Sequence, residues 1–151
     1  MFSAAVRAEQ ARRGSRKAYA RRAAAGRFER DLSEEVIRFI RERNSAYLAT
    51  ASAEGQPYMQ HRGGPAGFLK VLDARTVAFA NYPGNSQYIS IGNLAENERA
   101  FLFLMDYAEA RRLKLWGRAR VVSEEAGETI VFSVLAWDWN CSQHIPKLVA
   151  P

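Results

Sequence analysis

The sequence is poor in the residues that crosslink a small protein or bind metal. It has a single cysteine, Cys141, and only two histidines, His61 and His144. One cysteine cannot form an internal disulfide, and no Cys/His cluster has metal-ligand spacing, so we expect a reducing compartment and no bound metal. No apolar run reaches the roughly 18 residues that a membrane-spanning helix needs. These absences predict a soluble, cytoplasmic chain that does not enter a membrane.

Hydrolytic or nucleophilic chemistry also lacks its usual residues. No pair of carboxylates and no Ser/His/Asp grouping stands out, and neither histidine belongs to a set of nucleophile, base and orienting group. We therefore expect both histidines to be structural, and we assign no catalytic residue from the sequence.

The net charge of +6 comes from the N-terminus alone. Residues 1–30 carry nine Lys or Arg and two Glu, a net charge of +7, whereas the other 121 residues carry a net charge of −1. We predict a basic helical arm over 1–30 and one globular domain over 31–151. Charge runs are mostly solvated surfaces, so we favour an arm that packs on the domain or on a partner subunit. Contact with nucleic acid and organellar targeting are the less favoured alternatives.

The hydrophobic pattern predicts short strands joined in hairpins. A helix should begin after Ser33, because Ser33 can cap it and Glu34 meets the positive end of its dipole. A second helix is predicted over 86–96, with Asn85 as its cap, and residues 62–67 are too rich in Gly and Pro to be more than a loop or bulge. The fold class is mainly β with flanking helices, a small antiparallel barrel. The predicted strands are 46–52, 58–61, 68–72, 76–80, 100–107, 111–122 and 129–137.

The stretch 81–88 is dense in hydrogen-bonding groups and reads Asn-Tyr-Pro-Gly-Asn-Ser-Gln-Tyr. It leads from a predicted strand into a predicted helix, and the cationic run 111–118 follows later in the chain. A turn that opens a helix presents free backbone N–H groups, which favour phosphate. The sequence therefore predicts a site for a phosphorylated cofactor here.

Several segments, taken in order, resemble the flavin-binding split-barrel family typified by pyridoxamine 5′-phosphate oxidase. The resemblance covers about half of the chain and implies a split β-barrel that works as a homodimer and holds FMN in a groove between its two barrels. FAD or a deazaflavin is less favoured. The segments are Gly-Gln-Pro-Tyr at 55–58, Phe-Leu-Lys at 68–70, Phe-Ala-Asn-Tyr-Pro-Gly-Asn-Ser-Gln at 79–87, Asn-Leu-Ala-Glu-Asn-Glu-Arg at 93–99 and Arg-Arg-Leu-Lys-Leu-Trp-Gly at 111–117.

The resemblance also implies which residues bind the cofactor. It places Lys70 at a basic position before the second hairpin and Ala80 and Asn81 beside the flavin. Residues 85–87 stand where the oxidases carry Ser-Arg-Lys, so up to two charge-assisted phosphate contacts are lost. Arg62 and Arg112 are candidates to restore that charge. The predicted cofactor-binding set is Arg62, Lys70, Ala80, Asn81, Asn85, Ser86, Gln87 and Arg112.

The resemblance implies a flavin as the reactive group, which agrees with the lack of catalytic side chains because a coenzyme brings its own chemistry. We expect an FMN-dependent oxidoreductase that exchanges electrons with a small-molecule donor and acceptor. The oxidases' substrate-reading C-terminal segment is not recognisable in residues 136–144, so no substrate is assigned. The alternative is a flavin-binding module without turnover, such as a sensor or a carrier.

Overall fold

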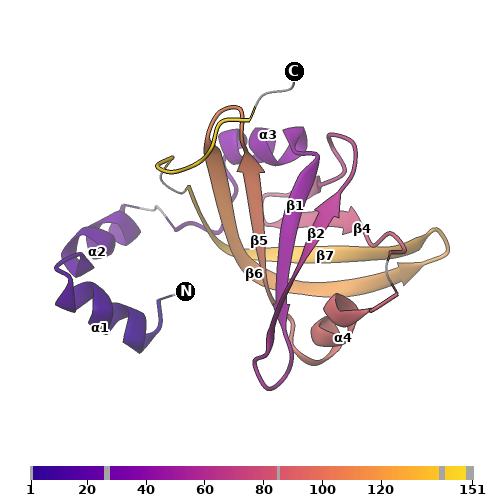
Figure 1. Cartoon of the computed structure of the whole chain (residues 1–151), viewed down its shortest axis with the longest axis horizontal. Coiled ribbons are helices and arrows are strands. Elements are labelled where there is room, and N and C mark those ends of the chain that lie inside the picture. The colour runs from indigo at the N-terminus through magenta and orange to yellow at the C-terminus, as the bar shows by residue number, and fades with distance from the viewer. Residues whose placement is uncertain (1, 26–27, 85, 140–141, 149–151) are drawn as a thin grey trace.

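Seven antiparallel strands form one strongly bent sheet in the order β2-β1-β5-β6-β7-β4-β3 (Figure 1). The structure is a computed structural model that describes residues 2–25, 28–84, 86–139 and 142–148. The sheet coils around a single core, with α3 at one end of the barrel and α4 against β1, β2 and β6. The elements are α1 (Ala4–Arg12), α2 (Arg16–Ala24), α3 (Glu34–Glu42), β1 (Ser45–Ala51), β2 (Pro57–Gly63), β3 (Lys70–Asp73), β4 (Thr76–Ala80), α4 (Ile89–Glu96), β5 (Arg99–Asp106), β6 (Arg111–Glu124) and β7 (Gly127–Trp139).

Strand alternation separates an inner face from an outer face. On β5 the side chains of Leu102 and Leu104 are fully buried, while Phe101 and Phe103, which alternate with them, are only half-buried. The same alternation runs through β1 and β6, because successive side chains of a strand point to opposite faces of a sheet. One face of the barrel wall therefore builds the core, and the other stays open to solvent or to a ligand.

Helix α3 closes one end of the barrel because its apolar residues share one face. Val36, Phe39 and Ile40 are buried, and the Ser33 hydroxyl oxygen accepts a hydrogen bond from the Val36 N–H at 3.4 Å. The cap satisfies one of the free N–H groups that a helix start leaves. The predicted helix start at Ser33 is thus confirmed.

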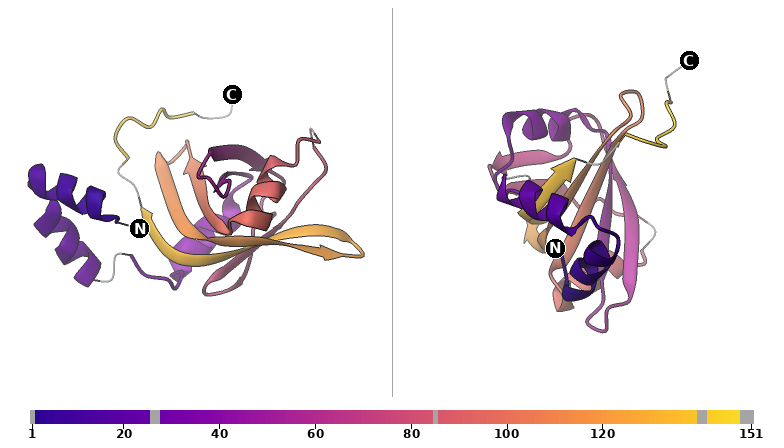
Figure 2. Two further views of the ribbon diagram at one scale, coloured as in Figure 1. Left: turned by 90° about the horizontal axis from the view of Figure 1, so that it is seen from below. Right: turned by 90° about the vertical axis from the view of Figure 1, so that its left-hand side faces the viewer.

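The basic arm forms two helices that stand away from the barrel, as Figure 1 and the left panel of Figure 2 show. Neither α1 nor α2 buries a residue. The hairpin is held by its own aromatic rings, since Phe2 packs edge-on against both Tyr19 and Phe28. The segment that connects the arm to the barrel is held by Trp137 of β7. The Trp137 backbone N–H donates to Glu29 O at 3.2 Å, and its indole N–H donates to Asp31 O at 2.9 Å. In this chain the arm helices do not pack on the domain.

The predicted fold class is confirmed, and two local predictions are wrong. Arg62 does not lie in a glycine-rich loop, because β2 continues to Gly63 by pairing Arg62 with Ala46 and Gly63 with Ser45. Helix α4 begins at Ile89, three residues later than predicted, because Ser86 and Tyr88 adopt left-handed backbone conformations that a helix cannot include. The predicted cap, Asn85, lies outside the described residues. Among those residues, no helix is long and apolar enough to cross a membrane.

Gly117 gives a direct test of the packing inside the bent sheet. It is buried at the irregularity where the β6–β7 register shifts, and an added Cβ would lie 2.5 Å from two ring carbons of Phe132 and closer still to the Ser133 carbonyl oxygen. We expect Gly117→Ala to lower the free energy of unfolding by about 1–3 kcal/mol, because the backbone must move to admit the methyl group.

Gly92→Ala is the matched control for this change. Gly92 lies in the exposed part of α4 with nothing within 4 Å of an added Cβ. This control should gain about 0.5–1 kcal/mol from helix propensity. Urea denaturation measures both variants, and equal effects of the two would contradict the packing argument.

Candidate functional site

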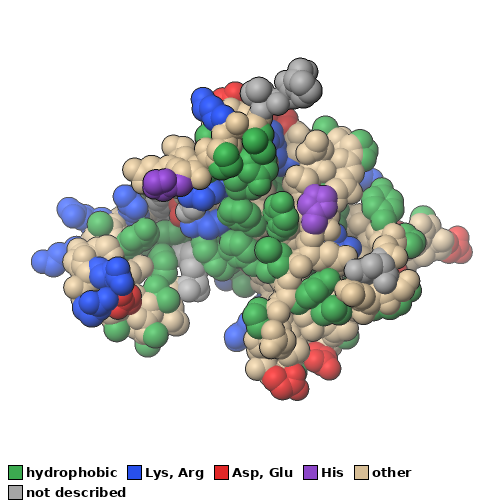
Figure 3. All heavy atoms as spheres, viewed as in Figure 1, with side chains coloured by type: hydrophobic (Ala, Val, Ile, Leu, Met, Phe, Trp, Pro, Cys, Tyr) green, Lys and Arg blue, Asp and Glu red, His purple; other side chains and the backbone are tan. Residues whose placement is uncertain are grey.

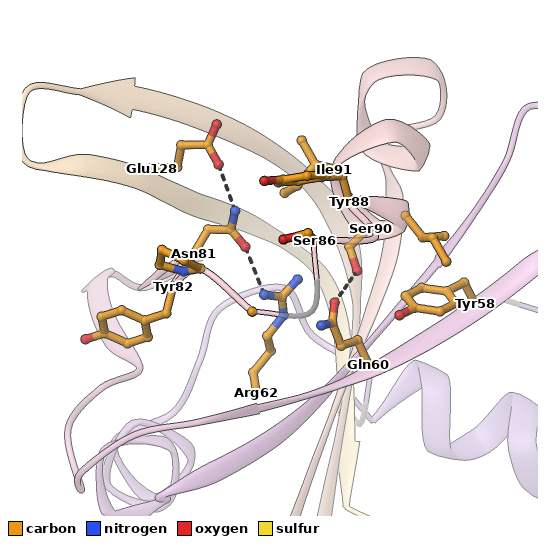
Figure 4. Close-up of a pocket in the computed structure, with 13 residues that line it drawn as sticks. Tyr58, Gln60, Arg62, Asn81, Tyr82, Ser86, Tyr88, Ser90, Ile91 and Glu128 are labelled. Carbon is orange, nitrogen blue, oxygen red and sulfur yellow. Dashed lines mark hydrogen bonds between the residues drawn. The ribbon is translucent and has the colours of Figure 1, made fainter.

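A cavity of about 250 Å³ lies between β2, the loop after β4 and the start of α4 (Figure 4). The β6–β7 hairpin closes one side through Glu128. Three of the predicted cofactor-binding residues line it together, namely Arg62, Asn81 and Ser86. The full lining is Tyr58, Gln60, Arg62, Asn81, Tyr82, Pro83, Gly84, Ser86, Tyr88, Ile89, Ser90, Ile91 and Glu128.

A chain of side-chain hydrogen bonds fixes the cation of this cavity. Arg62 Nη1 donates to Asn81 Oδ1 at 2.9 Å, and Asn81 Nδ2 donates to Glu128 Oε2 at 2.8 Å. Figure 4 shows the three side chains in line across the cavity wall. The backbone adds to this link, because Asn81 N donates to Glu128 O at 2.8 Å. Glu128 thus holds the Asn81 amide with its oxygen toward Arg62.

Arg62 still has an unused donor. Its Nε is buried and has no hydrogen-bond partner within the described part of the chain. Burial lowers the pKa of the Arg62 guanidinium, and the group stays charged because the ordinary pKa of arginine lies far above neutral pH. Leaving a buried charged donor unpaired costs stability. An anion bound in the cavity would offset the positive charge of the Arg62 guanidinium.

The start of α4 adds further donors to the same cavity. No side chain caps this helix, no acidic residue lies in its first turn, and Ile89, Ser90 and Ile91 all line the cavity. Ser90 is also tied to β2, because its hydroxyl donates to Gln60 Oε1 at 3.1 Å. The free N–H groups and the positive end of the helix dipole favour a bound anion.

The loop before α4 is held in an unusual conformation. Ser86 has a φ of 57° and Tyr88 a φ of 52°, and both are non-glycine residues in the left-handed region. Such conformations cost free energy and concentrate at binding sites, where the surrounding structure imposes them. Arg62, the uncapped helix start and this strained loop together suit a phosphate group.

A second cavity, of about 690 Å³, contains Lys70 and Ala80 and shares Tyr82 with the first. It lies on the outer face of β3, β4, β7 and β6. The predicted cofactor residues are therefore divided between two adjoining cavities, with Tyr82 as their common wall.

The remaining predicted residues lie elsewhere or outside the described chain. Arg112 lines a third cavity of about 540 Å³ with Tyr47 and His144, apart from Arg62 and Lys70 within one protomer. Gln87 is exposed in the loop before α4, and Asn85 is not among the described residues. No group of three or more His, Cys, Asp or Glu that could hold a metal ion occurs in the described ranges.

Sequence reasoning missed Glu128, Gln60 and Ser90. Glu128 reaches the site because β4 pairs with β7 so that Ala80 faces Thr129, which sets Asn81 next to Glu128. No local pattern reveals a contact across 47 positions of sequence. Tyr58, Gln60 and Arg62 alternate along β2 and so share one face of it. This alternation is the sequence signal that could have placed Gln60 in the same site as Arg62.

The coiled seven-stranded antiparallel sheet is a split β-barrel. The family model described as pyridoxamine 5′-phosphate oxidase matches residues 32–143, well over half of the chain. The chain belongs to this family. None of the curated proteins matches it.

Solved structures agree in fold at low sequence identity. HupZ of Group A Streptococcus is 17% identical with a TM-score of 0.57, covering 78% of this chain and 98% of that one. A putative pyridoxamine 5′-phosphate oxidase from Lactobacillus delbrueckii is 17% identical with a TM-score of 0.55, covering 72% and 93%. An FMN-binding protein from Syntrophomonas wolfei is 12% identical with a TM-score of 0.53, covering 85% and 96%.

The unpaired donor of Arg62 makes a prediction about stability. Replacing Arg62 by Met keeps an extended side chain and removes a half-buried charge that has a buried, unsatisfied N–H. We expect Arg62→Met to raise the free energy of unfolding of the ligand-free protein by about 1 kcal/mol, the gain typical of relieving a strained functional site.

Arg43→Met is the control, because Arg43 is a largely covered arginine whose donors are engaged. Its Nη1 pairs with Asp106 Oδ2 at 2.5 Å, and its Nε donates to Phe39 O at 3.2 Å. This variant should lose about 1–3 kcal/mol, because it leaves the Asp106 carboxylate without its partner. Denaturant titrations decide the matter, and a loss at Arg62 as large as that at Arg43 would show that Arg62 is structural.

Proposed function

We propose that the protein binds FMN and acts as an FMN-dependent oxidoreductase. The observation that carries the proposal is the Arg62 guanidinium, which is positioned by Asn81 and has a buried donor free beside the uncapped start of α4. Family membership supports a flavin, and one fold neighbour is an FMN-binding protein.

In this proposal the cofactor phosphate occupies the smaller cavity. Arg62 is the only Lys or Arg among its described lining residues, and it would supply the charge that the oxidases take from their Arg-Lys pair. The ribityl chain would pass Tyr82, and the ring system would lie on the row of Ala80, Thr129 and Val122 in the larger cavity. A small anion site of about 250 Å³ suits the terminal phosphate of FMN better than the internal diphosphate of FAD.

Bound FMN would accept a hydride from a reduced donor and pass the electrons on to oxygen or an organic acceptor. The protein's own groups bind and orient it. Glu128 is the one carboxylate that lines the phosphate cavity within the described ranges, and its hydrogen bond from Asn81 ties it to the wall. A flavin carrier or sensor without turnover is the second candidate, favoured because the one carboxylate among the described lining residues, Glu128, is already engaged by Asn81.

We further propose a homodimer built on the outer face of β1, β5 and β6. Figure 3 shows hydrophobic side chains gathered over these strands. Phe101 stacks with Phe103 on β5 and packs edge-on against Trp116 of β6, and Met59 of the adjoining strand β2 is 62% exposed. Patches of this kind mark protein–protein interfaces. Arg112 lies on the same face, so a second copy would bring it to the junction between two subunits.

The phosphate assignment is tested by comparing FMN with riboflavin, which lacks the phosphate. We expect Arg62→Met to weaken FMN binding about 10- to 100-fold and to leave riboflavin binding within about twofold, because a charge-assisted contact is worth about 1.5–3 kcal/mol. Quenching of flavin fluorescence measures both affinities, with Arg99→Met as the control. Equal losses for the two ligands would refute the phosphate role.

Turnover is tested separately, on the FMN-loaded protein. Stopped-flow absorbance should show bleaching of the flavin band on mixing with NADH or NADPH. A bound flavin that neither nicotinamide nor an amine donor reduces would favour the carrier or sensor.

The dimer is tested by placing a charge in the apolar face. Phe103→Glu should shift the protein from the mass of a dimer to that of a monomer in light scattering after gel filtration, because a buried unpaired charge opposes association. Val6→Glu, on the exposed surface of α1, should leave the dimer intact. A wild-type protein that is monomeric at micromolar concentration would end this proposal.

A further inference from the structure

The larger cavity has an apolar floor formed by the outer face of four adjoining strands. Its register is continuous, since Lys70 faces Ala78, Ala78 faces Val131, and Val131 faces Arg120. The next row runs through Ala80, Thr129 and Val122. Small and apolar side chains therefore form a flat floor between two cations, and Phe68, Leu72 and Tyr82 add apolar walls.

The two cations stand at opposite ends of one row. Lys70 and Arg120 are separated by three strand spacings, which places their Cα atoms about 14 Å apart. Alternation puts both side chains on the same outer face as Ala78 and Val131, and both line the cavity. Both side chains are exposed and can lean over the floor from either side.

Neither cation has a hydrogen bond or ion pair within the described residues. This sets them apart from the other cations of the same strands, since Arg118 pairs with Glu98 and Lys114 pairs with Asp138 at 3.5 Å. Glu124 also lines the cavity without pairing to either. Two unpaired positive charges at the ends of an apolar floor complement an elongated apolar ligand with an acidic group at each end.

We infer that this cavity takes the organic substrate, and that the substrate class is a flat, apolar dicarboxylate or a comparable organic dianion. The inference rests on the proposed function. The row that joins Lys70 to Arg120 lies next to the row of Ala80, on which the flavin ring is proposed to lie. Arg120 is then a specificity-determining residue, since it contacts the end of the substrate that Lys70 does not reach.

The test uses three naphthalenes that differ only in charge. Naphthalene-2,6-dicarboxylate, 2-naphthoate and the neutral naphthalene-2,6-dimethanol are titrated into the full chain by calorimetry, with and without FMN. We expect the dicarboxylate to bind at least about tenfold more tightly than 2-naphthoate, because each charge-assisted contact is worth more than 1.4 kcal/mol.

Variants locate the effect. Arg120→Met should abolish the preference for the second carboxylate and leave binding of the neutral diol within twofold. Arg99→Met removes an exposed arginine of β5 outside the cavity and should preserve the preference. Circular dichroism and the FMN affinity of each variant show that the fold and the phosphate cavity are intact.

Each result bears on one of the two proposals. No binding of the dicarboxylate by wild-type protein, or a preference that survives Arg120→Met, overturns the inference. Dicarboxylate binding that depends on Arg120 in a protein that takes up no FMN upholds this site and refutes the FMN proposal instead. Loss of the preference in Arg99→Met as well would show general charge attraction and would also overturn the inference.

Discussion

The organisation of this site depends on one half-buried charge, Arg62, that the fold leaves incompletely paired. Arg62 enters from β2, and the pairing of β2 with β1 fixes where its guanidinium lies. The β4–β7 pairing then places Asn81 and Glu128 so that one guanidinium nitrogen is satisfied and another is not. A protein interior normally tolerates such a group only where function requires it. The start of α4 and the strained loop before it add to this site, because the first N–H groups of the helix have no side-chain cap.

The coiled sheet explains how two different cavities can adjoin. The inner wall of the split barrel opens near Arg62, between β2 and α4, while the outer wall of β3, β4, β7 and β6 carries the apolar floor. Tyr82, just after β4, lies where these two surfaces meet. One cavity is small and rich in donors, and the other is wide and mostly apolar. This division matches a ligand with an anionic tail and a flat head.

The sequence was sufficient for the strands, α3 and the family, because alternation, capping and motif order are local signals. It failed where long-range pairing decided the structure. Gly63 and Gly64 suggested a loop at Arg62, yet the ladder with β1 keeps Arg62 in a strand. The helix start at Ile89 depends on the left-handed backbone at Tyr88, a conformation that a tyrosine in the sequence does not predict. The contacts of Glu128 and the row joining Lys70 to Arg120 exist only through strand register.

The projecting arm gives the molecule a strong electrical asymmetry. Residues 1–30 carry a net charge of +7, most of it on the α1–α2 hairpin, which stands apart from a nearly neutral barrel, and Trp137 binds the backbone of the connecting segment. The chain therefore carries a large permanent dipole, directed along a line from barrel to arm. Retention on a cation-exchange column will depend on the charge of this hairpin more than on the overall charge of the chain. Nucleic acid that co-purifies from a lysate will reflect the same attraction, whatever the barrel binds.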